Sequence, residues 1–182
     1  MTDADNVEKS TRKVFHQIHL GHLGDERIAA RHTNLIELNR MGLPDDFLYG
    51  LKCADLGCGS AVHGSVNMLE LGAGVVYAID VDDSFIKSAK KRLGGSERFN
   101  GRWHLDVGSL MDLPYDDGSF DFVLCAGVIH HTVDDEKAVD EIYRVMKIGA
   151  KGYLSVTGGG GILNRLFMDV VRDEYKNNPA MQ

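Results

Sequence analysis

The chain has 182 residues, of which 43% are hydrophobic and 26% charged, with a net charge of −7. It holds enough apolar residues for one domain, has no apolar run of the roughly 18 residues that span a membrane, and begins with the polar segment Met1–Asp5, so we expect a cytoplasmic protein without a secretory signal. Lys and Arg total 20 against 27 Asp and Glu, without a basic cluster, which argues against nucleic acid as a partner.

The first predicted element is a helix over residues 25–41, which ends at Gly42 and Pro44. Its apolar side is formed by Ile28, Leu35, Ile36 and Leu38. We interpret residues 1–44 as an N-terminal helical cap and residues 45–182 as the core of the domain.

Short apolar runs then alternate with amphipathic segments. The expected strands are residues 51–56, 75–80, 102–107, 120–126 and 152–157. The expected helices are residues 62–71, a segment that begins after Asp82 or Asp83 and stops at Gly94, and residues 134–146. The apolar side of the second helix is formed by Phe85, Ile86, Ala89 and Leu93. This alternation predicts an α/β fold with a doubly wound parallel sheet and right-handed crossovers.

A glycine turn follows the first expected strand. Asp55 ends the apolar run, and Gly57 and Gly59 then allow the backbone to turn sharply and to lie close to a ligand. Asp80 lies 25 positions after Asp55, at the expected end of the next strand, where a carboxylate can accept both hydroxyls of a ribose. The two segments together indicate a nucleoside site.

The third glycine of the dinucleotide fingerprint is missing. Counted from Gly57 it would stand at position 62, which is Val62, so a pyrophosphate is poorly accommodated. The carboxylate of Asp55 would also repel a phosphate and attract an amine. S-adenosylmethionine carries such an amine, a sulfonium and an adenosine, and it has no phosphate.

Five segments in this order and spacing resemble the class I S-adenosylmethionine-dependent methyltransferases, in particular their small-molecule (methyltransferase type 11-like) group. The matching segments are 54–59, 79–81, 108–115, 119–124 and 127–131. Two positions depart from the pattern: Ala61 replaces a frequent further glycine, and Ser109 replaces the Asp that often holds the adenine amino group. The resemblance implies a Rossmann-like fold, S-adenosyl-L-methionine as cofactor and a small-molecule methyl acceptor.

The resemblance also implies roles for individual residues. The methionyl end of the cofactor would lie against Asp55, Gly57, Cys58 and Gly59. Asp80 would bind the ribose and Val81 the adenine face. The adenine edge would meet Ser109 and Leu110, with Asp106 as a weaker candidate, and Ala126 would complete the cofactor-binding set.

His130 and His131 follow the fourth expected strand, at the edge where open α/β sheets bind ligands. Either could act as a catalytic base for an acceptor that must lose a proton, or could instead pack and hold the loop. Because adjacent side chains usually point apart, we expect at most one of them to face the pocket.

No metal is expected. The three cysteines are odd in number and form no CxxC pair, which argues against a disulfide framework and a zinc site; they are Cys53, Cys58 and Cys125. The histidines at every third position have no cysteine or acidic ligands at suitable spacing; they are His16, His19 and His22.

After the fifth expected strand, glycines 158–161 lead into an amphipathic segment over residues 162–175. The family resemblance implies seven strands in the order 3-2-1-4-5-7-6, and the last two are not recognisable here. We therefore expect a core truncated at its C-terminus, with the fifth strand as an open edge that could be covered by the final segment or support a homodimer.

Three functions compete. The first is methyl transfer to a small molecule, with oxygen, nitrogen or carbon as acceptor left open. The second is a non-catalytic module of the same fold that binds the cofactor or docks a partner protein through the fifth-strand edge. The third is a nicotinamide-dependent oxidoreductase, which Val62 disfavours.

Overall fold

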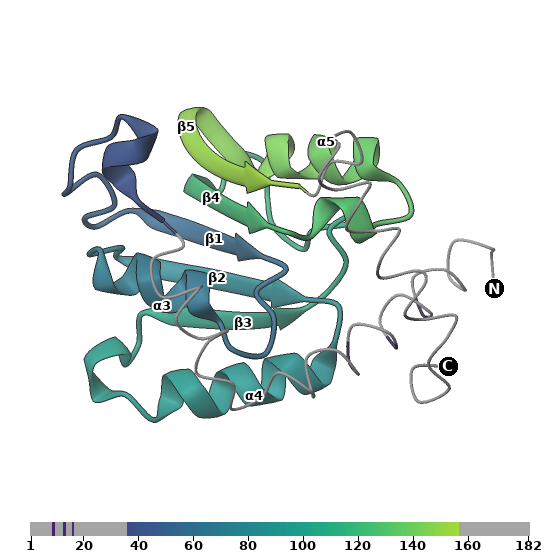
Figure 1. Cartoon of the computed structure of the whole chain (residues 1–182), viewed down its shortest axis with the longest axis horizontal. Helices are drawn as coiled ribbons and strands as arrows, with labels where there is room; N and C mark the ends of the chain where they lie inside the picture. The colour runs from purple at the N-terminus through teal and green to yellow at the C-terminus, as the bar shows by residue number, and fades with distance from the viewer. Residues whose placement is uncertain (1–8, 10–12, 14–15, 17–35, 157–182) are drawn as a thin grey trace, which may run out of the picture.

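A parallel five-stranded sheet lies at the centre of the part of the chain that the structure describes (Figure 1). The structure is a computed structural model, and it describes residues 9, 13, 16 and 36–156. The strand order is β3-β2-β1-β4-β5, and all four pairings are parallel. The strands are β1 (Lys52–Leu56), β2 (Val75–Asp80), β3 (Trp103–Val107), β4 (Phe120–Ala126) and β5 (Met146–Ser155). The predicted parallel doubly wound sheet is confirmed.

The middle of the sheet is the most apolar part because it is covered on both faces. In β1 the four residues 53–56 are all buried, and β4 has buried side chains at five of its seven positions. The strand β5 lies at the outer edge of the described sheet, and several of its side chains are exposed. Because β1 and β4 are paired in parallel, the loops that follow them lie next to each other at the centre of the carboxyl edge.

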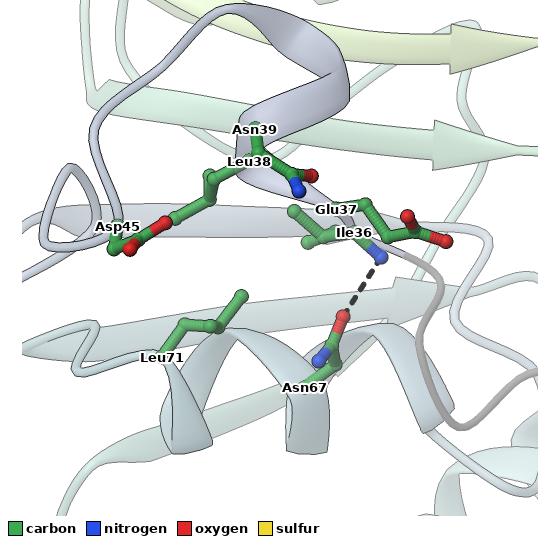
Figure 2. A pocket seen from close by; sticks show the side chains of 7 residues that line it. All are labelled: Ile36, Glu37, Leu38, Asn39, Asp45, Asn67 and Leu71. Atoms are coloured by element: carbon green, nitrogen blue, oxygen red, sulfur yellow. Dashed lines mark hydrogen bonds between the residues drawn. The ribbon is translucent and has the colours of Figure 1, made fainter.

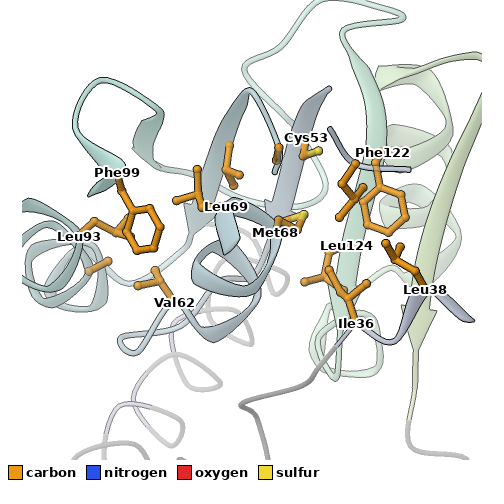
Figure 3. Packing of buried hydrophobic residues seen from close by; sticks show 14 residues of the cluster. Ile36, Leu38, Cys53, Val62, Met68, Leu69, Leu93, Phe99, Phe122 and Leu124 are labelled. Carbon is orange, nitrogen blue, oxygen red and sulfur yellow. The ribbon is translucent and has the colours of Figure 1, made fainter. Parts of the chain in front are cut away.

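Helices cover both faces of the sheet. The helices α3 (His63–Glu70) and α4 (Asp83–Gly94) pack with the 3-10 helices η1 (Leu38–Met41) and η2 (Glu97–Phe99) on one apolar cluster, part of which Figure 3 shows. On the other face lie α5 (Asp135–Val145), the 3-10 helix η3 (Ile129–His131) and the loop that contains Leu110 and Leu113. None of the helices in the described ranges is long and apolar enough to span a membrane.

The helix α4 forms as expected. The side chain of Asp82 accepts a hydrogen bond from the Ser84 backbone N–H, so Asp82 rather than Asp83 is the N-cap. The predicted apolar side of the helix is buried, at Phe85, Ile86, Ala89 and Leu93.

The predicted helix over residues 25–41 is wrong at its C-terminal end, and residues 25–35 lie outside the described ranges. Glu37 has an extended backbone, with φ −112° and ψ 94°, and the four residues after it form only the 3-10 helix η1. The Ile36 N–H donates to Asn67 Oδ1 at 2.8 Å, and Ile36 and Leu38 both reach the core. An extended segment with two inward side chains spaced two apart therefore replaces the last helical turns.

The fifth strand begins earlier than expected, at Met146 directly after α5, rather than at residue 152. A bulge separates its two parts, because Phe120 pairs with Met146 whereas Phe122 pairs with Lys151. Gly149, with φ +82°, lies within this irregular stretch. The bulge breaks the alternation of buried and exposed side chains, which is the signal that would have predicted the start of the strand. The expected segments at 158–161 and 162–175 lie outside the described residues.

Candidate functional site

The glycine turn after β1 is closely packed against two neighbouring strands. The backbone N–H groups of Gly57 and Cys58 both donate to the carbonyl oxygen of Ile79, at 2.8 and 3.0 Å. Gly57 has φ +80°, and a Cβ there would lie 2.4 Å from a methyl group of Val128, which follows β4. Glycine is therefore required at position 57 by both conformation and space, and the turn joins the ends of β1, β2 and β4.

Asp80 joins two of the loops at this edge. Its carboxylate accepts the Gly59 N–H on Oδ2 at 2.9 Å and the Asp82 N–H on Oδ1 at 3.0 Å. The residue is 9% exposed. A carboxylate has about four lone-pair sites and accepts hydroxyl groups as well as N–H groups. Asp80 thus lies at the end of β2, as expected, and it joins the glycine turn to the loop after β2. Its role as a ribose ligand stays a prediction.

Asp55 is buried beneath the N-terminus of α3. It accepts the Ser65 hydroxyl at 2.6 Å and also bonds the Ser65 backbone. Burial raises the pKa of Asp55 to about 6, although both bonds from Ser65 lower it. Helix α3 has no side-chain cap from its own N-cap residue, Val62, so the carboxylate of Asp55 takes that place.

The carboxylate of Asp55 affects which ligands can bind at the N-terminus of α3. In dinucleotide-binding sheets the N-terminus of the helix after the first strand receives the pyrophosphate. Here that position faces the buried carboxylate of Asp55, and a Cβ at Gly64 would already lie 2.9 Å from it. A phosphate would meet an acidic group in place of free N–H donors.

Val62 is less informative about ligands than its sequence position suggested. It is the one non-glycine residue with a positive φ in the described ranges, at φ 44° and ψ 39°, and its side chain is fully buried. The backbone thus keeps the left-handed turn that a glycine would adopt, while the side chain packs in the core. The case against a pyrophosphate rests on Asp55 and not on the missing third glycine.

The residues expected around the adenine lie on the neighbouring loops. Val81 is half-buried after β2, and Leu110 is buried in the cluster on the α5 face. The hydroxyl of Ser109 accepts the Met111 N–H at 3.3 Å, so it takes part in a local turn. Ala126 is half-buried at the end of β4.

Two side chains near these loops are held by specific interactions. Asp106 accepts the hydroxyl of Tyr115 at 2.9 Å. Burial, followed by the charge of Asp106, raises the pKa of Tyr115, which keeps the hydroxyl protonated. Burial, followed by the charges of Asp55 and Asp80, raises the pKa of Cys58 well above its usual value, which favours the protonated thiol.

The two histidines lie in η3 and contact each other, contrary to the expectation that adjacent rings would point apart. Their ring centroids are 3.9 Å apart, with an angle of 58° between the planes. Both are half-buried. Burial and the neighbouring His130 lower the pKa of His131, which favours the neutral form that can accept a proton. The tight helical turn of η3, which sequence alone did not predict, brings the rings together.

Sequence reasoning missed two partners of the site. Ser65 bonds Asp55, and His16 bonds Asp82 at 3.0 Å. The position of Ser65 in the first turn of a helix was a usable signal, but nothing in the sequence pairs residues 16 and 82. No group of side chains in the described ranges could hold a metal ion, and Cys53, like the other two cysteines, is a free thiol.

A hollow of about 410 Å³ lies elsewhere, between η1 and the end of α3 (Figure 2). Its lining residues are Ile36, Glu37, Leu38, Asn39, Asp45, Asn67 and Leu71. None of the candidate cofactor-site residues lines this hollow.

Comparison with known proteins connects this geometry to a family. Residues 54–154 match the family model described as a methyltransferase domain. The demethylmenaquinone methyltransferase of Clavibacter sepedonicus is 33% identical over 102 residues, which are 56% of this chain and 39% of that protein. Phosphoethanolamine N-methyltransferase 2 of Caenorhabditis elegans is 30% identical over 128 residues, which are 70% of this chain and 28% of that protein.

The chain thus spans about a third of the length of these curated relatives. Among solved structures, the PH0226 protein of Pyrococcus horikoshii OT3 has a TM-score of 0.60 at 22% identity, covering 83% of this chain and 63% of that one. At this identity the structural likeness concerns the fold.

Proposed function

Because the chain belongs to the class I S-adenosylmethionine-dependent methyltransferase family, we propose that it transfers a methyl group from S-adenosylmethionine to a small-molecule acceptor. The observation that carries this proposal is the pair of acidic groups at the carboxyl edge. Asp55 occupies the helix N-terminus that a pyrophosphate would need. Asp80 bonds the glycine turn, and a carboxylate is a group that accepts ribose hydroxyls. A nucleoside with a cationic end and no phosphate fits both.

Different residues at the carboxyl edge would contact different parts of the cofactor. The methionyl end would lie against the turn of Gly57, Cys58 and Gly59, near the carboxylate of Asp55. The ribose would bond Asp80. The adenine would lie beside Val81, Ser109 and Leu110, and Ala126 would border the site from β4. A hydroxyl such as that of Ser109 can accept a bond from the adenine amino group while also serving its own turn.

When bound, S-adenosylmethionine supplies a methyl group on a positively charged sulfur, which is already a good leaving group. The task of the protein is then to hold the acceptor in line with the methyl carbon and to exclude water. His131, at the same edge and with a lowered pKa, would take a proton from an acceptor that must lose one. His130 would hold the ring of His131 by direct contact.

Small-molecule acceptors are supported by the names of the relatives, which are a demethylmenaquinone methyltransferase and a phosphoethanolamine N-methyltransferase. The acidic composition of the chain points the same way, since a nucleic acid substrate favours a basic surface.

A homodimer through the β5 edge is a further part of the proposal. Leu154 in β5 is 43% exposed, and Val156, which follows the strand, is 59% exposed. An exposed apolar edge strand is a common site of strand pairing between chains. Sedimentation equilibrium tests this part: a concentration-dependent dimer that Leu154→Lys abolishes is expected, and a monomer at all concentrations contradicts it.

The cofactor assignment is tested by calorimetric titration with S-adenosylmethionine, S-adenosylhomocysteine and NAD in parallel. We expect the first two to bind and NAD not to bind. If they bind, a screen of small amines, phenols and quinols then identifies the acceptor. A folded sample that binds neither sulfur compound would contradict the proposal and favour a module of this fold that serves contacts between proteins.

A further inference from the structure

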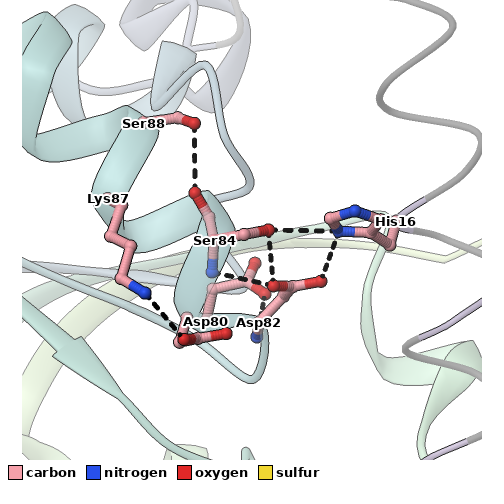
Figure 4. A network of polar contacts seen from close by, with 7 residues as sticks. His16, Asp80, Asp82, Ser84, Lys87 and Ser88 are labelled. Carbon is pink, nitrogen blue, oxygen red and sulfur yellow. Dashed lines mark hydrogen bonds and ion pairs between the residues drawn. The ribbon is translucent and has the colours of Figure 1, made fainter.

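His16 lies against the loop after β2, although 66 positions separate it from its partner Asp82. Its Nδ1 is 3.0 Å from Asp82 Oδ2 and 3.1 Å from Ser84 Oγ (Figure 4). The ring also stacks on Phe85, with centroids 5.8 Å apart and only 7° between the planes. His16 therefore has both a polar and an apolar attachment to the start of α4.

The hydrogen bonds around Asp82 determine which group donates. Asp82 Oδ1 accepts the Ser84 N–H at 2.9 Å and the Ser84 hydroxyl at 2.7 Å. The hydroxyl hydrogen of Ser84 is thus directed at Asp82, and the lone pairs of Ser84 Oγ are left to accept from His16. An ionised carboxylate only accepts, so Nδ1 of His16 must carry the hydrogen that is shared between Asp82 and Ser84. Because the side chain of Asp82 is 5% exposed, this donor stabilises a nearly buried charge.

The same carboxylate belongs to a chain of hydrogen bonds that leads into the candidate cofactor site. The backbone N–H of Asp82 donates to Asp80 Oδ1 at 3.0 Å, and the other oxygen of Asp80 accepts the Gly59 N–H at 2.9 Å. A displacement of Asp82 would therefore be transmitted to the carboxylate of Asp80 and to the glycine turn.

We propose that His16 is a positioning residue of the cofactor site. By holding the side chain of Asp82, it fixes the turn over residues 80–84 in the conformation in which Asp80 is aligned for the ribose. The part of the inference that concerns the cofactor rests on the proposed function. The part that concerns the contact of His16 with the turn is independent of the proposed function, and it can be measured in the protein without ligand.

The test compares three variants of His16 in the full chain. His16→Ala removes both attachments, and His16→Phe keeps a ring beside Phe85 but loses the donor. His16→Asn places its amide nitrogen close to where Nδ1 lies, so it restores the donor. Lys13→Ala, at an exposed position on the same segment, is the control.

Two quantities are measured. The first is the dissociation rate of radiolabelled S-adenosylhomocysteine, which should rise roughly ten-fold in His16→Ala and His16→Phe, as for the loss of one hydrogen bond to a charged group. The second, in the protein without ligand, is hydrogen exchange of the Asp82 and Ser84 amides by NMR. Both amides are hydrogen-bonded within the turn, and their exchange should accelerate in the same two variants. His16→Asn and Lys13→Ala should resemble the wild type.

The outcomes separate the two claims. If the wild type does not bind S-adenosylhomocysteine but amide exchange responds as expected, the proposed function fails and the hold of His16 on the turn stands. If the wild type binds and neither quantity changes in His16→Ala, the role of His16 is overturned while the proposed function stands. Faster amide exchange with unchanged dissociation would overturn the link between His16 and the cofactor.

Discussion

Replacement of Asp80 should affect stability and cofactor binding separately, because its carboxylate performs two tasks. One is structural: it accepts the Gly59 and Asp82 N–H groups at 2.9 and 3.0 Å. The other is the proposed contact with the ribose. Asp80→Ala removes both, whereas Asp80→Asn keeps one acceptor oxygen and turns an amide donor toward the other N–H.

The magnitudes follow from the number of donors left without an acceptor. A buried N–H that loses its partner costs about 1–3 kcal/mol, so Asp80→Asn should lower the free energy of unfolding by about that amount and Asp80→Ala by about twice as much. Loss of the hydrogen bonds to the ribose should weaken cofactor binding by about 1.5–3 kcal/mol in Asp80→Ala. Asp83→Ala is the matched control, since its exposed carboxylate pairs with Lys87 at 3.1 Å and contributes about 0.5–1 kcal/mol with the helix dipole.

Urea unfolding measures the first effect and calorimetric titration with S-adenosylhomocysteine the second. We expect the order of stability to be Asp83→Ala, Asp80→Asn, Asp80→Ala, from most to least stable. An Asp80→Ala protein as stable as the Asp83→Ala control would refute the structural task, and unchanged affinity in a folded Asp80 variant would refute the ribose contact.

Three further predictions concern other parts of the site. Gly64→Ala should destabilise the fold by about 1–3 kcal/mol in urea unfolding, because the new Cβ would lie 2.3 Å from Leu124 Cδ2. The control Gly94→Ala, which has nothing within 4 Å of its new Cβ, should be neutral or slightly stabilising. Equal effects of the two substitutions would contradict the close approach of α3 to the sheet. For Asp55, the folded pKa of about 6 exceeds the unfolded value of 3.8, so the folded state binds more protons between these values and stability should fall as the pH rises from about 4 to 6. The expected fall in the free energy of unfolding is about 1–3 kcal/mol, and it should be absent in Asp55→Asn. If Asp55→Asn instead shows the same pH dependence as the wild type, Asp55 is not the buried ionisable group responsible. His131→Ala should lower turnover without changing cofactor affinity. Because the pKa of His131 is lowered, the turnover of the wild type should persist below about pH 6.5, the usual pKa of histidine. Loss of activity at or above that pH would contradict the role of His131 as a base.

The local parts of the fold were predictable because each depends on neighbours in sequence. Strands β2 and β4 have the predicted bounds, and the cap of α4 is one of the two predicted aspartates. The two failures, at residues 36–41 and at the start of β5, occur where a long-range contact overrides the local pattern. The N–H of Ile36 bonds a side chain of α3, and the bulge in β5 is defined only by its pairing with β4.

By itself the sequence determined the alternating architecture, the glycine turn and the two acidic positions at strand ends, because periodicity and turn chemistry are properties of short segments. Only the tertiary structure decided how the acidic groups are used. Asp55 caps a helix whose own N-cap residue cannot do so, Asp80 joins two loops, and His16 reaches Asp82 across 66 positions. The burial of a carboxylate and its hydrogen-bond partners depend on which segments meet in space. Burial and these partners determine the pKa and the orientation of each carboxylate at the site.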